Sequence, residues 1–334
     1  MKNSKNQGAT VGLDVGTSRV VLAQRSGEDF QYDSQLNAFV GIPFSKLTAS
    51  VLEKEGVPHA VQGNEIIVHG NESEKFAELM NAEIRRTMTR GTLDAKEPDS
   101  LSMIKEIVTS LTGGDVAPDS KVCFTIPAAP LGGEENVTYH ESTLRHMLNQ
   151  IGYKTKSINE GLAVIYGELE STNYTGIGIS CGGGLCNVAM AYLSVPVLSF
   201  SIPKAGDYID ASTAAVLGER INRVRIAKEE SFHLNGYFGE KVSQVLTVYY
   251  DEMINALVAG LKESFASTRN LPRIGRPVPL VLSGGTALPG GFRDRFEKVL
   301  RENDLPVQIS EVKMASNPLY AAAKGALVAG LAEM

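Results

Sequence analysis

The sequence predicts an α/β protein built from two similar halves, and three observations lead to this prediction. Two apolar strand–turn–strand units with glycine at the turn lie about 166 residues apart, at Gly16 and Gly182. Helical patterns occur between and after these units, so strands and helices alternate along the chain. The strand–turn–strand units are antiparallel, which predicts mixed sheets rather than purely parallel ones. A plan that occurs twice predicts a duplicated domain.

The first half begins with the strand patterns TVGLDV and RVVLAQ, which are joined by a glycine turn at 16–18. Apolar residues at helical spacing then predict helices over 100–111 and 141–152. The segment FVGIPF, residues 39–44, predicts a core strand. The alternative for this segment is an exposed patch that contacts a membrane.

The second half repeats the plan with the strand patterns GIGISC and LCNVAMAYL on either side of three glycines at 182–184. A third strand pattern, PLVLS, leads into Ser-Gly-Gly-Thr at 283–286 and the helical pattern GFRDRFEKVLREN. The segment GDYIDAS at 206–212 predicts a turn. Further patterns predict helices over 160–170, 243–267 and 317–334.

Length and charge exclude several classes of protein. A chain of 334 residues has room for about two domains. With 32 Lys and Arg against 38 Asp and Glu, the net charge of −6 argues against direct binding of nucleic acid. Three cysteines argue against a secreted disulfide framework. No apolar run reaches the ~18 residues of a membrane span, and the polar N-terminus has no signal-peptide pattern, so we expect a cytoplasmic protein.

The glycine turns are the candidate functional feature, because 33 glycines are more than an average chain carries. A tight turn points several backbone N–H groups into one concavity, which binds phosphate. Thr17 and Ser18 add hydroxyl donors, and Asp14 is placed to hold Mg²⁺ through its waters. The alternative for a single turn of this kind is an ordinary hairpin. Three similar turns in one chain are poorly explained as ordinary hairpins.

Cys181 and Cys186 form a C-x₄-C pair that invites a zinc interpretation. A zinc site normally needs four ligands, and neither histidine nor further cysteine lies near this pair. We therefore interpret the two cysteines as small residues in a hairpin.

The ordered set of motifs resembles the actin-like ATPase superfamily, which includes actin, the 70-kDa heat-shock chaperones and the sugar kinases. GLDVGTSR resembles its first phosphate loop, and ISCGGGLCNVAM resembles the second. INEGLAVIYG and NPLYAAAKGAL resemble the two connecting helices, and VLSGGTALPGGF resembles the adenosine segment. CFTIPAAP and IPKAGDYID are similar to elements of the prokaryotic MreB-like and MamK-like branch.

The resemblance implies a two-domain actin-like fold, with duplicated ribonuclease H-like sheets and ATP–Mg²⁺ in the cleft between them. Domain I would span 1–158, completed by the helix at 317–334. Domain II would span 159–316, with a small subdomain that is reduced around 211–243. The implied nucleotide contacts are Asp14 (also to Mg²⁺ through water), Gly16, Thr17, Ser18, Gly182, Gly183, Gly184, Arg225, Lys228, Gly284, Gly285 and Thr286.

The second phosphate loop departs from the family pattern, in which an acid precedes the glycines and another acid follows them. Ser180 and Asn187 occupy those two positions here. Loss of a group that stabilises charge typically costs about 10²–10³ in rate, so we expect slow hydrolysis. Glu134 and Glu135 are the candidates to polarise the hydrolytic water, and the alternative is that they begin a helix. The segment RVRIAKEES falls where the family has a Glu-x-x-Lys segment beside the purine and ribose. Lys228 matches that pattern and Arg225 does not, with a solvated lysine as the alternative for Lys228.

These features lead to two functional hypotheses. The first is an ATP-binding cytoskeletal protein that polymerises head-to-tail with itself and hydrolyses ATP slowly. Membrane-associated or cargo adaptor proteins would be further partners. The second is a non-polymerising ATP-binding adaptor or chaperone-like regulator, which the altered loop and the reduced subdomain favour. A small-molecule kinase is weaker, because no aspartate base is evident in the first half.

Overall fold

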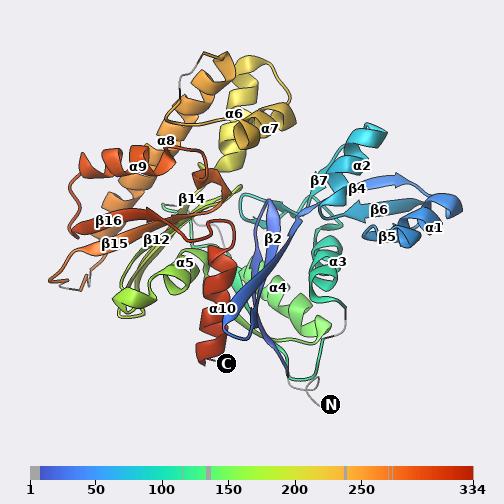
Figure 1. Ribbon diagram of the computed structural model, residues 1–334, viewed down its shortest axis with the longest axis horizontal. Coiled ribbons are helices and arrows are strands. Elements are labelled where there is room, and N and C mark those ends of the chain that lie inside the picture. Colours follow the sequence, from blue (N-terminus) through green and yellow to red (C-terminus); the bar gives the residue numbers. More distant parts are fainter. Residues whose placement is uncertain are drawn as a thin grey trace.

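The structure is a computed structural model that describes residues 8–114, 116–132, 137–236, 239–269, 271–272 and 274–333. Two five-stranded sheets lie side by side, each with helices against it, and two helices pass between them (Figure 1). A smaller four-stranded sheet extends from the first half (Figure 1). Within the described residues no helix is long and apolar enough to cross a membrane.

The first large sheet has the strand order β11-β10-β1-β2-β3. β1 pairs antiparallel with β2 and parallel with β10, so the sheet is mixed as predicted. Its helices are α3 (Ser100–Thr112) and α4 (Val137–Ile151), and α4 begins four residues before the predicted start at 141. The strands are β1 (Thr10–Val15), β2 (Arg19–Ser26), β3 (Asp29–Leu36), β10 (Lys121–Ile126) and β11 (Lys154–Asn159).

The second large sheet has the order β14-β13-β12-β15-β16. β12 pairs antiparallel with β13 and parallel with β15, which repeats strand for strand the directions in the first sheet. The duplication predicted from the two glycine hairpins is therefore confirmed in the topology. The strands are β12 (Gly176–Cys181), β13 (Cys186–Tyr192), β14 (Val195–Ile202), β15 (Val278–Ser283) and β16 (Ile309–Met314).

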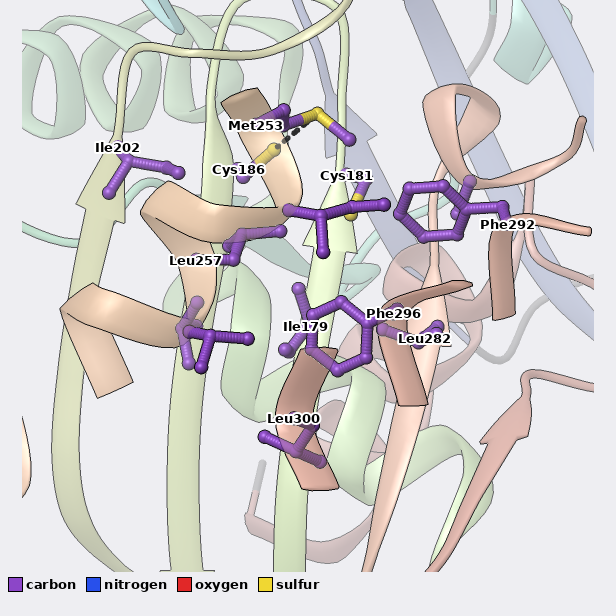
Figure 2. Packing of buried hydrophobic residues seen from close by; sticks show 14 of the residues in the cluster. Ile179, Cys181, Cys186, Ile202, Met253, Leu257, Leu282, Phe292, Phe296 and Leu300 are labelled. Carbon is purple, nitrogen blue, oxygen red and sulfur yellow. Dashed lines mark hydrogen bonds between the residues drawn. The ribbon is translucent and has the colours of Figure 1, made fainter. Parts of the chain in front are cut away.

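The core of the second half lies between its sheet and the helices α8 (Lys241–Ser267) and α9 (Phe292–Arg301) (Figure 2). Cys181 and Cys186 are fully buried in this core, and the Cys186 thiol lies 3.7 Å from the Met253 sulfur. The described residues contain no group of three or more His, Cys, Asp or Glu side chains that could hold a metal ion. Both cysteines belong to the hydrophobic cluster of this core, one at each side of the second glycine turn.

The helices α5 (Glu160–Glu168) and α10 (Ala321–Glu333) cross between the two large sheets (Figure 1). Their backbones touch, because a Cβ placed on Gly325 would lie 1.6 Å from the Ala163 carbonyl oxygen. Alanines of both helices share one buried cluster with side chains from strands of both sheets. This crossing joins the two halves beneath the cleft.

The small sheet, in the order β5-β6-β4-β7, carries two helices on one face. FVGIPF is its β4, and Phe39 and Val40 are fully buried, so the predicted core strand is confirmed and the membrane-patch alternative is wrong. The elements are β4 (Ala38–Pro43), α1 (Lys46–Lys54), β5 (His59–Gln62), β6 (Glu65–His69), α2 (Glu72–Met80), β7 (Arg85–Arg86) and the hairpin β8–β9 (Met88–Thr89 and Thr92–Leu93).

Two further helices follow β14 in the second half, α6 (Gly206–Leu217) and α7 (Ile221–Glu230). The predicted turn at 206–212 is wrong, because these residues form the first turns of α6. Two short 3₁₀ turns complete the elements, η1 (Glu170–Thr172) and η2 (Gly285–Ala287).

Candidate functional site

A cavity of about 380 Å³ lies between the two halves, above the crossing of α5 and α10. All three glycine turns line it: 16–18 between β1 and β2, 182–184 between β12 and β13, and 284–286 after β15. Every residue that the resemblance implied as a nucleotide contact lies in its wall. Glu134 and Glu135 lie outside the described residues.

The first two glycine turns face each other across the cavity at van der Waals distance. A Cβ on Gly183 would lie 2.2 Å from the Ser18 hydroxyl. A Cβ on Gly184 would lie 2.4 Å from the Thr17 hydroxyl and 2.6 Å from the Gly91 nitrogen. Glycine is therefore required at these two positions by the approach of the opposite wall.

The backbone of the second turn is oriented by the segments behind it. Gly206 and Asp207, at the start of α6, donate their N–H groups to the Gly182 and Gly183 carbonyls at 3.1 and 2.8 Å. The Thr286 hydroxyl also donates to the Gly182 carbonyl, at 2.8 Å. Since the carbonyls are engaged from behind, the turn offers its remaining N–H groups to the cavity.

Backbone donors without a protein acceptor gather at the two turns. Within the described chain, no carbonyl or side chain accepts from the N–H groups of Thr17, Ser18, Gly183 or Gly184. By contrast, Gly16 and Gly182 donate to Arg19 and Leu185 and close the two hairpins. Four such N–H groups, all on residues that line one small cavity, are a donor set of the kind that binds anions.

Two half-buried carboxyl groups line the cavity, Asp14 near the end of β1 and Glu160 at the start of α5. Burial raises the pKa of Asp14 to about 6, and a hydrogen bond from the Thr125 hydroxyl, at 2.5 Å, opposes the rise. Burial also raises the pKa of Glu160 to about 8. The charge of Asp14 adds to this rise, and a hydrogen bond with Ser180 opposes it.

The carboxyl pair fits a magnesium ion better than a metal cage made of protein ligands alone. Neither Asp14 nor Glu160 has a Lys, Arg or His partner in the part of the chain that the structure describes. Magnesium commonly keeps several waters and takes one or two carboxylates together with substrate phosphates. Two half-buried acids without a cationic partner, in the same cavity as the free N–H groups, match that donor set.

The Asn187 side chain connects Glu160 to the first half of the chain. Its Nδ2 donates to Glu160 Oε2 at 2.7 Å, and its Oδ1 accepts from the Ala128 N–H at 2.9 Å. Asn187 is 1% exposed and lies directly opposite Ser180 in the β12–β13 pairing. The two positions that lack the family's acids are therefore both beside Glu160.

Lys228 and Arg225 lie on α7, and both line the cavity. The Lys228 ammonium donates to Asp210 Oδ2 at 2.8 Å and is buried, so the solvated alternative is wrong. Burial raises the pKa of Asp210, and the charge of Lys228 opposes that rise. The Arg225 guanidinium donates to Glu74 of α2, on the opposite side of the cleft.

A second ion pair joins the two sides nearer the glycine turns. Arg86 of β7 donates to Asp207 of α6, Nη1 to Oδ1, at 2.9 Å. Asp207 Oδ1 lies 3.6 Å from a Cβ placed on Gly183, so this pair stands beside the second turn. In one pair the arginine belongs to the first half of the chain, and in the other pair it belongs to the second half. Each side of the cleft therefore contributes one arginine and one carboxylate.

Unpartnered polar atoms concentrate in this cavity. Five buried side-chain polar atoms of the described residues have no hydrogen-bond partner, and three of them belong to cavity residues: Asp210 Oδ1, Arg225 Nε and Tyr250 Oη. A buried polar atom without a partner costs about 1–3 kcal/mol, so such a cluster is typical of a site completed by a ligand.

Sequence reasoning did not identify Glu160, Asn187, Thr125 or Asp207 as site residues. The available signal was position: Glu160 directly follows β11, and Thr125 lies near the end of β10. Ends of neighbouring strands in α/β folds converge on ligand sites. The sequence also does not show that α5 begins beneath the second glycine turn, and the tertiary structure was needed to place Glu160 in the site.

The chain is similar in structure to several solved proteins. It matches the protein of a MamK double helical filament with TM-score 0.73 and 19% identity, over 98% of this chain and 99% of that one. It matches MreB 5 of Spiroplasma citri bound to AMPPNP with TM-score 0.68 and 15% identity, over 96% and 95%. For the ethanolamine utilization protein EutJ from Carboxydothermus hydrogenoformans the values are 0.56 and 16%, over 98% and 91%.

These likenesses establish the fold, which is the two-domain actin-like fold. No curated protein sequence matches the chain. The Volactin family model matches residues 9–330, which is nearly the whole chain, and the protein therefore belongs to the Volactin family.

Proposed function

We propose that this protein is an actin-like cytoskeletal protein that binds ATP with Mg²⁺ in the cavity and polymerises head-to-tail. The observation that carries the proposal is the pair of facing glycine turns, whose four unengaged N–H groups share one cavity with the half-buried acids Asp14 and Glu160. A polyphosphate satisfies those donors. A divalent cation compensates the two acids, which otherwise oppose binding of an anion.

The walls of the cavity differ in chemistry, so we assign different parts of the nucleotide to different walls. We assign the turns at 16–18 and 182–184 to the phosphates, and 284–286 lines the same cavity. We assign the sugar and base to the wall of the cavity that includes Arg225 and Lys228 of α7. Bound Mg²⁺ supplies charge neutralisation of the phosphates, while Asp14 and Glu160 hold its waters in place.

Domain closure around the nucleotide connects binding to assembly. We place domain I at 1–158 with the helix 317–334, and domain II at 159–316, with the α5–α10 crossing as the hinge. A nucleotide that is held by turns from both domains favours the form in which the domains are closed. Copies of the protein in this closed form that contact one another head-to-tail extend into a filament. The similar MamK structure is a double helical filament, and MreB 5 of Spiroplasma citri is described with ADP and with AMPPNP.

Slow hydrolysis and a cytoplasmic location complete the proposal. Ser180 removes the family's acid before the second turn, and Glu134 and Glu135 remain the proposed groups that polarise water. A non-polymerising ATP-binding adaptor is the competing function. A point mutant of MamK with a similar structure is described as non-polymerising with AMPPNP bound, so fold and nucleotide do not by themselves imply filaments.

The test combines ATP titration calorimetry with sedimentation and electron microscopy in ATP–Mg²⁺, ADP–Mg²⁺ and EDTA. We expect micromolar ATP binding, filaments in ATP–Mg²⁺ and slow phosphate release. Gly184→Val should abolish ATP binding, because the new side chain would meet Thr17 and the Gly91 backbone. Gly236→Val is the control: a Cβ at this position has its nearest described neighbour at 3.7 Å, so the variant should bind ATP normally. ATP binding without filaments at high protein concentration would establish the adaptor function, and no ATP binding would refute the proposal.

A further inference from the structure

Asn187 makes two hydrogen bonds that only a carboxamide can make together. Its NH₂ group donates to Glu160 Oε2 at 2.7 Å, and its carbonyl oxygen accepts from the Ala128 N–H at 2.9 Å. An ionised aspartate would accept from Ala128 but has no donor for Glu160. It would also bring a further acid beside Asp14 and Glu160.

The opposite position on the neighbouring strand points to the same conclusion. Ser180 pairs with Asn187 in the β12–β13 register, so both side chains lie on one face of the sheet. An acid at either position would stand against Glu160, which is already within electrostatic reach of Asp14. With uncharged residues at 180 and 187, Glu160 has hydrogen-bonding neighbours there in place of further acids.

Ala128 ties this arrangement to the opposite half of the molecule. The segment after β10 is fixed on β14, because Ser201 Oγ donates to the Ala128 carbonyl at 2.9 Å and the Ser201 N–H donates to the Ala129 carbonyl at 2.9 Å. Asn187 is thus held at its carbonyl end by a rigid segment, and its donor end fixes the direction of the Glu160 carboxylate.

We propose that Asn187 is a positioning residue that holds the Glu160 carboxylate beside Asp14 at the cation site. The proposal rests on the proposed function, since it concerns the cation that accompanies the nucleotide. Removing a residue that orients a metal-binding group typically weakens metal affinity about 10- to 100-fold.

A double-mutant cycle tests whether Asn187 acts through Glu160. The readout is the Mg²⁺ enhancement of ATP binding, which is the Kd in EDTA divided by the Kd in Mg²⁺, together with the Tm of the nucleotide-free protein. Asn187→Ala and Glu160→Gln should each reduce the enhancement by about tenfold or more. Asn187→Ala should cause no further loss in the Glu160→Gln background, because the group that it positions is already neutral.

Returning the acid to the glycine turn provides a rescue. Glu160→Gln combined with Ser180→Asp should recover most of the enhancement that Glu160→Gln loses, since the double variant again has two acids in the cavity. A purely structural role for Asn187 predicts instead a lower Tm, and equal losses of enhancement with and without Glu160→Gln. That additivity, or an unchanged enhancement in Asn187→Ala, would overturn the assignment. Failure of the unaltered protein to bind ATP in either condition would overturn the proposed function itself.

Discussion

The Arg225 guanidinium on α7 donates to the Glu74 carboxylate on α2, and the two residues are 151 positions apart in the chain. The pair bridges the mouth of the cleft from the second half to the first. Arg86 and Asp207 bridge it in the reverse sense, from the first half to the second, at 2.9 Å. Opening of the cleft must separate both pairs, so they stabilise the closed form independently of any ligand.

The Arg225–Glu74 pair should slow nucleotide release. Its side chains are 15% and 40% exposed, so solvent screening limits its contribution to about 1 kcal/mol, or about fivefold in the opening equilibrium. We expect Arg225→Glu to release a fluorescent ATP analogue several-fold faster in stopped flow. The charge exchange Arg225→Glu with Glu74→Arg should restore slow release. Arg223→Ala breaks an exposed ion pair on the same helix and should have no effect.

Arg86 should protect the phosphate end of the cavity from the charge of Asp207. Because Asp207 stands beside Gly183, loss of Arg86 leaves an uncompensated carboxylate near the site proposed for phosphate. We expect Arg86→Ala to weaken ATP binding several-fold in calorimetry, most strongly at low salt, where charges are least screened. Adding Asp207→Asn should reverse the loss. If the double variant binds as weakly as Arg86→Ala, the charge of Asp207 is not the cause.

Gly325 should be required for the helix crossing between the two halves. A Cβ there would lie 1.6 Å from the Ala163 carbonyl oxygen, a backbone atom that cannot rotate away. Gly325→Ala should therefore lower stability by about 3 kcal/mol, a loss typical of overpacking, and reduce the Tm. Gly236→Ala, at an open position, should leave the Tm nearly unchanged. Equal Tm values for the two variants would mean that α5 and α10 can move apart with little loss of stability.

Acid should destabilise the protein between about pH 6.5 and pH 4 through buried histidines. Burial lowers the pKa of His140 to about 4, and burial also lowers the pKa of His69 to about 4. The unfolded chain takes up these protons near pH 6.5, so stability is present above that pH and is lost as the pH falls. Each residue contributes up to about 3 kcal/mol to the loss.

Replacing His140 should remove its part of this pH dependence. Asparagine keeps an acceptor for the Leu93 N–H, which donates to His140 Nδ1 at 3.2 Å. We expect the Tm of His140→Asn to fall less than that of the unaltered protein between about pH 6.5 and pH 4.5. His146 is exposed, so His146→Asn should keep the full dependence. A parallel fall in all three proteins would assign the acid sensitivity to carboxyl groups.

The sequence by itself determined the local elements that backbone chemistry dictates. Glycine turns between apolar strands predicted both hairpins, and helical periodicity predicted α3, α5 and α8 within a few residues of their observed bounds. The repeated plan predicted two equivalent mixed sheets, which the strand directions confirm. GDYIDAS was predicted wrongly as a turn because its polar residues favour turns locally, whereas packing of α6 against α7 and α8 decides for a helix.

Only the tertiary structure decided which charges meet. The sequence showed that residues 180 and 187 lack acids, but not that Glu160 lies against both of them. It placed Lys228 and Arg225 on one helix, but not their partners Asp210 and Glu74. Turns and helices arise from interactions between near neighbours in the chain, and so leave a local pattern. A half-buried carboxyl pair arises from segments that folding brings together, so its chemistry appears only once α5, β1 and β13 share one cavity.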